Sequence, residues 1–129
     1  MKSAIFYLAL ATLFTHELDA MPNHEWRGMP VLGSFSDDVA MTWFVLLHIP
    51  LFAGLIALVA NGNARTRLLS RLVIGAFLIV HGVLHYLKMG DPTYEFSSVT
   101  SHALIFGGAV LGAAYLALEA KGGMRGVAA

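Results

Sequence analysis

The chain has 129 residues, of which 57% are hydrophobic and only 12% charged, and its eight basic side chains balance eight acidic ones. Water-soluble domains carry about 25% charged residues, so this composition indicates one integral membrane domain over residues 1–129. The zero net charge and the lack of a basic cluster argue against nucleic acid as a partner, and the absence of cysteine excludes disulfides, thiolate metal sites and cysteine nucleophiles.

Four apolar segments are long enough, or nearly long enough, to cross a bilayer as helices, which takes about 20 residues. In chain order they cover residues 3–21, 40–60, 68–89 and 98–120. They predict an all-α, multi-pass four-helix bundle. The first segment could instead be a signal peptide, with Lys2 before an apolar stretch and LDA as a cleavage site, although His16-Glu17 is not a typical flank for one.

The basic side chains predict the orientation of this bundle. With four spans, the two termini and the loop after the second helix share one side. That side holds six of the eight Lys and Arg residues, namely Lys2, Arg65, Arg67, Arg71, Lys121 and Arg125. The positive-inside rule therefore places both termini in the cytoplasm.

The first predicted helix ends in several ionisable side chains, within the stretch LFTHELDAMPNHEWRGMP. His16 and Asp19 lie three residues apart and share a helix face, so we expect both to be metal ligands. Glu17 points about 100° away, and three roles are open to it: a carboxylate that orients an imidazole, an acid/base catalyst, or a carboxylate that snorkels to the interface. Glu25, in the loop that follows, is within reach of the site and is a second candidate catalyst, whereas His24 fits a solvated loop.

The second predicted helix contains His48 two residues before Pro50. Proline cannot bond the carbonyl of Leu46 and should kink the helix. A freed carbonyl beside a membrane histidine is common where a cavity or ligand sits. His48 is therefore a candidate cofactor ligand, and a structural histidine with its hydrogen bonds satisfied is an equal alternative.

The third and fourth predicted helices carry the remaining histidines. In the stretch HGVLH, His81 and His85 are four residues apart on one helix face, a spacing at which two imidazoles can bind one metal ion. His102 lies near the start of the fourth helix and is a further candidate ligand. Gly108 and Gly112 form a GxxxG pattern, which indicates either tight helix packing or contact with a second copy or a larger membrane complex.

The predicted topology places five histidines at one level of the membrane. Counting about 1.5 Å per residue from the helix ends, they lie roughly 6–12 Å below the same surface. The five are His16, His48, His81, His85 and His102. A charged or strongly polar group in the apolar layer costs a few kcal/mol unless it has a partner. The sequence therefore predicts one convergent polar site under the outer surface.

The motif HELDA followed by HEWR resembles that of small uncharacterised bacterial membrane proteins of the HXXEE-domain family, and the similarity covers most of the chain in its layout. The motif departs from the family pattern, because the acid three residues after His16 is Asp19 and the next residue is Ala20, not a second acid. The resemblance implies a metal-dependent activity in a bacterial inner (plasma) membrane, without implying a particular reaction.

A metalloenzyme is the first function that these observations favour. Histidine and carboxylate ligands without sulfur suit zinc or non-haem iron. A site just below the headgroups suits a lipid or isoprenoid-like substrate in the outer leaflet. Zinc would activate water for hydrolysis and iron would carry oxidation, so the enzyme would be a hydrolase or an oxidoreductase.

Three other functions fit parts of the sequence. A b-type haem could be held between His48 and either His85 or His102, although haem ligation does not explain Glu17 and Asp19. A non-enzymatic small subunit of a membrane complex fits the size and the GxxxG pattern. A cation-driven cyclase would use Glu17 and Asp19 as proton donors and would need no metal.

Overall fold

The computed structural model describes residues 1–127 of the chain, and the side chains of residues 1–122. The described residues form four α-helices and contain no strand. The helices are α1 (Lys2–Ala20), α2 (Asp37–Val59), α3 (Ala64–Lys88) and α4 (Val99–Val127), and two short 3-10 helices, η1 (Glu25–Gly28) and η2 (Leu32–Ser34), lie between α1 and α2. The all-α fold class is therefore confirmed, and each predicted segment falls on one helix.

Local chemistry explains where two of these helices begin. The side chain of Asn63 accepts hydrogen bonds from the backbone N–H groups of Arg65 and Thr66, which caps the start of α3. Asp37 and Asp38 occupy the first turn of α2, where negative charge is favoured by the helix dipole. Pro50 lies inside α2, and α2 continues through it.

Three of the four helices are long and apolar enough to cross a membrane: α2, α3 and α4. Most large apolar side chains of α2 are exposed, and an exposed apolar surface of this extent marks contact with lipid or protein. These two features indicate that the protein associates with a membrane. The fourth predicted span, α1, is not among the three, because His16, Glu17 and Asp19 make its last turns polar.

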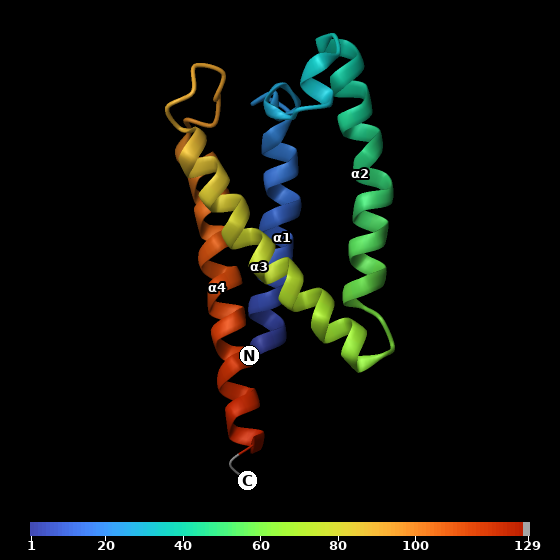
Figure 1. Ribbon diagram of the computed structural model, residues 1–129, viewed down its shortest axis with the longest axis vertical. Helices are drawn as coiled ribbons and strands as arrows, with labels where there is room; N and C mark the ends of the chain where they lie inside the picture. The colour runs from blue at the N-terminus through green and yellow to red at the C-terminus, as the bar shows by residue number, and fades with distance from the viewer. Residues whose placement is uncertain (128–129) are drawn as a thin grey trace.

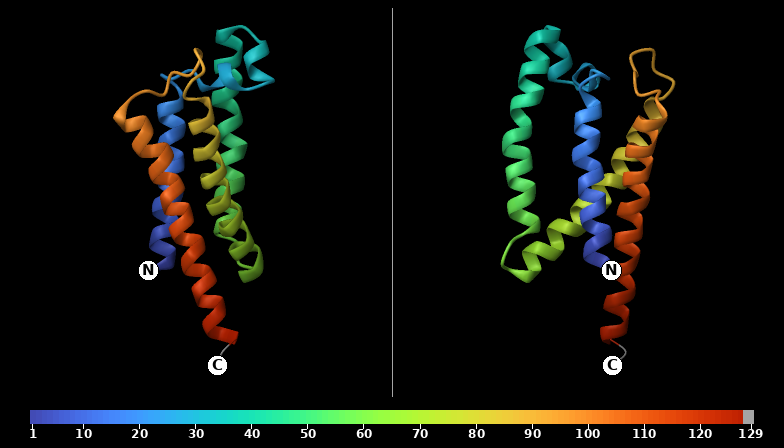
Figure 2. Two further views of the ribbon diagram at one scale, coloured as in Figure 1. Left: turned by 60° about the vertical axis from the view of Figure 1, so that its left-hand side comes forward. Right: turned by 180° about the vertical axis from the view of Figure 1, so that it is seen from behind.

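The helices pack unequally against one another. In Figure 1, α1 lies in the middle and α3 crosses it diagonally, while α4 runs along the other two. Both α1 and α3 contact α4 extensively, and they contact each other much less. Helix α2 contacts mainly α3 and the 3-10 helices, and it stands apart from α1 in Figure 1 and in the right-hand view of Figure 2.

The two ends of the molecule differ in what they hold. The N-terminus lies at the same end as the turn between α2 and α3, and the loops over residues 21–36 and 89–98 lie together at the opposite end (Figures 1 and 2). One apolar core includes Phe6, Leu78 and Tyr115 and lies toward the end that holds the N-terminus. The second core lies toward the loop end, and the loops themselves contribute Trp26 and Phe96 to it.

The GxxxG pattern of α4 is used inside the chain. A Cβ atom added at Gly112 would lie 2.6 Å from the carbonyl oxygen of Gly75 in α3, and one added at Gly108 would contact Leu78 and Thr12. The missing side chains therefore let α4 approach α3 and α1 closely.

Candidate metal centre

Three imidazoles meet between α1 and α3, near the loop end of both helices. His16 comes from α1, and His81 and His85 lie one turn apart on a single face of α3. The ring centroids are 4.9 Å apart for His16 and His81, 5.1 Å for His16 and His85, and 4.5 Å for His81 and His85. His16 is 1% exposed and His85 is 7% exposed, so these two rings are buried, and His81 is half-buried.

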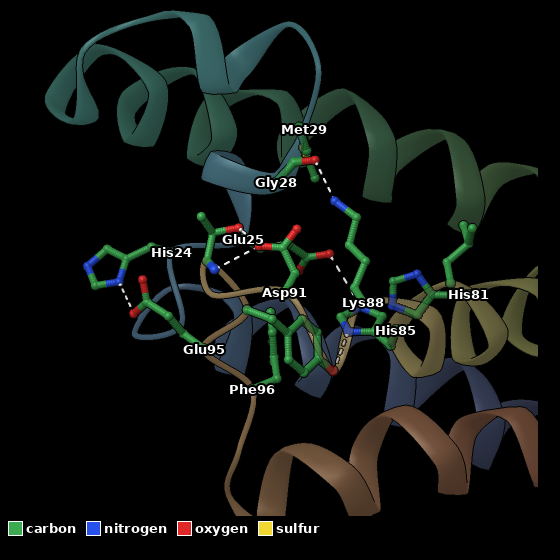
Figure 3. Close-up of a pocket in the computed structure, with 13 residues that line it drawn as sticks. His24, Glu25, Gly28, Met29, His81, His85, Lys88, Asp91, Glu95 and Phe96 are labelled. Atoms are coloured by element: carbon green, nitrogen blue, oxygen red, sulfur yellow. Dashed lines mark hydrogen bonds and ion pairs between the residues drawn. The ribbon is translucent and has the colours of Figure 1, made fainter.

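Glu25 is the fourth member of this group, and it comes from the loop after α1. Its Oε2 atom lies 3.6 Å from Nε2 of His16, and its Oε1 atom lies 3.7 Å from Nε2 of His85. The chain turns back at His24, whose φ of 47° is left-handed, a conformation that residues other than glycine seldom adopt. Helix η1 then begins at Glu25 and holds it over the imidazoles, as Figure 3 shows for His81 and His85.

The four side chains, called the His/Glu cluster below, have the composition and spacing of a metal site. One ligand atom from each of His16, Glu25, His81 and His85 lies within 4.8 Å of all the others. Ligand atoms placed tetrahedrally at 2.0–2.1 Å from zinc are about 3.3 Å apart. The two contacts of Glu25 with His16 and His85 are already close to that spacing.

Several polar atoms of the cluster are buried without a hydrogen bond. Among the described residues, both ring nitrogens of His16, Nε2 of His81 and Oε2 of Glu25 have no partner. Buried polar atoms in proteins are nearly always hydrogen-bonded, and each unpaired one costs about 1–3 kcal/mol. A bound cation would supply a partner for one ring nitrogen of His16, for Nε2 of His81 and for the carboxylate of Glu25, so the residues present fit a metal ion with nitrogen and oxygen ligands.

The ionisation of Glu25 suits this role. Burial raises the pKa of Glu25, but its contact with His85 and the positive charge that the neighbouring imidazoles can carry outweigh burial, so its pKa lies below the ordinary value. Glu25 is therefore ionised near neutral pH, which is the form of a carboxylate that binds a metal.

Tyr94 supports the cluster from the loop between α3 and α4. Its hydroxyl lies 3.1 Å from Nδ1 of His85, which leaves Nε2 of His85 facing Glu25. Metal-ligating histidines commonly donate their second N–H to an oxygen of this kind. Burial raises the pKa of Tyr94. The sequence analysis missed Tyr94, and its place in the short loop directly after α3 is the signal that could have found it.

A set of ion pairs holds the Glu25 loop in place. His24 Nδ1 lies 2.8 Å from Glu95 Oε2, and Arg27 donates to the other carboxylate oxygen of Glu95 at 2.9 Å. Arg27 also pairs with Asp37 at the start of α2. The hydrogen bond with His24 lowers the pKa of Glu95. We call His24, Arg27, Asp37 and Glu95 the loop latch, since they join the two loops that cover the cluster.

Glu17 and His48 form a separate pair beside the cluster. Oε2 of Glu17 lies 2.9 Å from Nε2 of His48, whose Nδ1 donates to the carbonyl of Phe44 at 2.6 Å. His48 therefore has a partner at each ring nitrogen and lies outside the group of four. Glu17 points about 100° away from His16 on α1, and it is Glu17 that pairs with the histidine of α2.

Two predicted metal ligands also lie outside the cluster. Nε2 of His102 lies 3.1 Å from the carbonyl oxygen of Phe96 and donates to it. Asp19 lies one turn beyond His16, and its Oδ2 atom is buried with no partner among the described residues. The structure thus brings His16, His81 and His85 together, adds Glu25, and leaves Asp19 and His102 aside.

Two openings reach the cluster from different sides. The first is a pocket of about 170 Å³ between the covering loops and α3, lined by Lys88, Tyr94 and Phe96 among others and drawn in Figure 3. The second is a groove of about 370 Å³ between α1, α2 and α3. Glu25 and His81 line both, so the cluster lies between the two openings.

Comparison with known proteins identifies one family. Residues 2–122 match the model of a family described as "Family of unknown function (DUF6713)". The comparisons with curated proteins and with solved structures gave no match. The family match does not connect the chain with the HXXEE-domain family that its motif resembles.

Proposed function

Since the chain belongs to DUF6713, a family of unknown function, we propose a function from the geometry of its own residues: an integral membrane protein that binds one metal ion through the His/Glu cluster. The observation that carries this proposal is the convergence of four donor groups, three of which, His16, Glu25 and His81, have buried atoms without a hydrogen-bond partner among the described residues. One divalent cation would give each of these three groups a partner, using one ring nitrogen of His16.

Zinc and non-haem iron are the proposed ions. Three imidazoles and one carboxylate without sulfur suit both metals. The bound ion would supply either a water activated for hydrolysis or a centre for oxidation. The chain's own contribution is access and proton transfer: both openings reach Glu25 and His81, and Glu17, hydrogen-bonded to His48, faces the groove as the proposed acid/base group.

The proposed substrate is a lipid or isoprenoid-like molecule of a bacterial inner membrane. The cluster lies at the end of the molecule opposite Lys2 and the start of α3, which carries Arg65 and Arg67. The positive-inside rule then puts the termini in the cytoplasm and the cluster near the outer leaflet. His16 is four residues from the end of α1, about 6 Å below it, which is the depth of a lipid's polar–apolar boundary.

The alternative functions have less support. A haem between His48 and His85 or His102 would have to displace hydrogen bonds that all three histidines make with protein oxygens. Assembly with another copy or a larger complex through Gly108 and Gly112 would compete with the packing of these glycines inside the chain.

Elemental analysis and an absorption spectrum of detergent-purified protein test the proposal. We expect about one zinc or iron per chain and no Soret band. The variants His16→Ala and His81→Ala should each lose at least about tenfold in metal affinity, because each removes a ligand. His102→Ala is the matched control and should retain the metal. Protein that binds no transition metal, or loses it equally in all three variants, would contradict the proposed function.

A further inference from the structure

Six buried side-chain atoms lack a hydrogen-bond partner among the described residues, and one ion in the His/Glu cluster would account for only three of them. The six atoms belong to His16, Asp19, Glu25, Arg71 and His81. The ion would pair with Oε2 of Glu25, Nε2 of His81 and one ring nitrogen of His16. Arg71 lies toward the opposite end of the molecule, in the first half of α3. Two atoms at the loop end therefore remain: the second ring nitrogen of His16 and Oδ2 of Asp19.

The ring nitrogen of His16 that remains is Nδ1, and it would be a hydrogen-bond donor. Nε2 of His16 lies 3.6 Å from Oε2 of Glu25, which makes Nε2 the atom on the metal side. A neutral imidazole that binds a metal through Nε2 carries its proton on Nδ1. His16 is 1% exposed, so this N–H group is buried. The two remaining atoms are thus one donor and one carboxylate acceptor.

Asp19 is placed to accept this hydrogen bond. His16 and Asp19 lie three residues apart on α1, and side chains at this spacing are neighbours, with Cβ atoms about 5–6 Å apart. The two side chains are close enough to interact electrostatically. Asn23 donates to the backbone carbonyl oxygen of Asp19 at 2.6 Å, which leaves Oδ2 without a competing donor among the described residues. Asp19 is outside the group of four, so it would act through His16 and not on the ion.

We propose that Asp19 is the positioning residue of His16: in the metal-loaded protein, the Nδ1–H group of His16 donates to Oδ2 of Asp19, directly or across one water. This inference rests on the proposed function, because an ion at Nε2 leaves the proton on Nδ1. A carboxylate on the far nitrogen fixes the orientation of the ring and makes the histidine a stronger ligand, and removal of such a partner costs about 10–100-fold in metal affinity.

The zinc affinity of the full-length protein in detergent tests this role, measured by competition with a chelator. Asp19→Ala should weaken zinc binding by about 10–100-fold. Asp19→Asn keeps an oxygen acceptor and should recover most of this loss. Asp38→Ala is the matched control, because it removes one carboxylate that is exposed at the start of α2, and it should bind zinc as the wild type does. Equal affinities for Asp19→Ala and Asp38→Ala would overturn the inference.

Nitrogen-15 spectra of histidine-labelled protein, recorded at saturating zinc, show whether Asp19 acts through His16. A buried and hydrogen-bonded ring N–H group exchanges slowly with water and gives a proton signal. Asp19→Ala should lack one ring N–H signal that the wild type shows, and Asp19→Asn should retain this signal at a changed position. Weaker zinc binding by Asp19→Ala with every ring N–H signal retained would overturn the inference, since Asp19 would then act on the ion directly.

Thermal unfolding of the chelator-treated protein distinguishes positioning from a structural role. Oδ2 of Asp19 is buried without a partner among the described residues, and removal of an unpaired buried polar group does not destabilise a fold. Asp19→Ala should therefore unfold at the same temperature as the wild type or higher. A lower unfolding temperature without metal would make Asp19 a structural residue and overturn the inference.

The outcomes for the wild type separate the two proposals. Wild-type protein that binds zinc, together with an Asp19→Ala variant that binds it equally well, would overturn the positioning role and leave the metal site standing. Wild-type protein that binds no transition metal would overturn the proposed function, and the role of Asp19 with it.

Discussion

His16 is 1% exposed, yet neither of its ring nitrogens has a hydrogen-bond partner among the described residues. An apolar side chain at this position would avoid that desolvation cost, so packing alone does not explain a histidine here. Its neighbours His81, His85 and Glu25 each place one possible ligand atom within 4.8 Å of the others and of His16. At the scale of single residues, this desolvation cost supports the proposed metal ion as the reason for the cluster.

Tyr94 gives a prediction at this scale. Tyr94→Phe removes the hydroxyl partner of His85 Nδ1, so the ring should lose its fixed orientation, and metal affinity should fall about 10–100-fold. Competition with a fluorescent zinc chelator measures this affinity. Tyr86→Phe is the control, since Tyr86 lies on the same helix as His85 and is 67% exposed. Equal affinities in the two variants would show that Tyr94 does not orient His85.

At the scale of helices, small residues determine how closely α3 and α4 approach. A Cβ atom at Gly112 would lie 2.6 Å from the Gly75 carbonyl oxygen, and one at Gly82 would lie 2.9 Å from Cβ of Ala109. Backbone atoms cannot move aside as a flexible side chain can. The crossing of α3 over α1, and with it the placement of His81 and His85, therefore depends on these contacts with α4.

Substitution of one glycine tests this dependence. Gly112→Ala should destabilise the protein by about 1–3 kcal/mol, because the added methyl group overpacks the interface. Gly107→Ala, five residues earlier on the same helix, adds a methyl group with nothing within 4 Å and should leave stability unchanged or slightly raised. Thermal unfolding followed by circular dichroism in detergent compares the two. A Gly112→Ala protein as stable as Gly107→Ala would contradict this view of the interface.

The sequence predicted the helices and three of the four cluster residues as metal ligands, for identifiable reasons. Apolar segment length located each helix, and the depth count placed His16 level with His81 and His85, which do meet. Depth does not determine rotation about a helix axis, so it could not tell that His102 donates to Phe96. Nor could it tell that α2 stands apart and leaves His48 with Glu17.

Glu25 shows a different limit of the sequence. Its place in a loop after α1 made it a candidate catalyst, but its position in the cluster depends on the left-handed backbone at His24 and on partners far along the chain, such as Glu95. Such tertiary contacts override local preference, and no periodic pattern encodes them.

For the molecule as a whole, the loop latch joins parts of the chain that are distant in sequence. Glu95, before α4, holds both His24 and Arg27, and Arg27 also pairs with Asp37 at the start of α2. Exposed ion pairs contribute little to the stability of a whole fold. Their combined effect is local: they hold η1, and therefore Glu25, over the imidazoles.

The latch should be sensitive to acid. Its contacts lower the pKa of Glu95 from an ordinary 4.5, so the stabilisation is complete above pH 4.5 and is lost as the pH falls through the lower folded-state pKa. Limited proteolysis within residues 22–36 should therefore increase as the pH falls from about 5 to about 3. Glu95→Gln should show faster cleavage already at the higher pH and a smaller further increase. Asp38→Asn, an acid outside the latch, should behave as the wild type; identical profiles for both variants would exclude the latch.

The unequal helix packing also bears on the order of assembly during synthesis. All four cluster residues precede α4 in the chain, yet α1 and α3 contact each other only over a short region and are held together mainly by their shared contacts with α4. A nascent chain that ends before residue 99 therefore contains every ligand without the helix that brings α1 and α3 into register. Helix α4 acts as the template on which the earlier part of the chain completes the cluster, so the four side chains come together only late in translation.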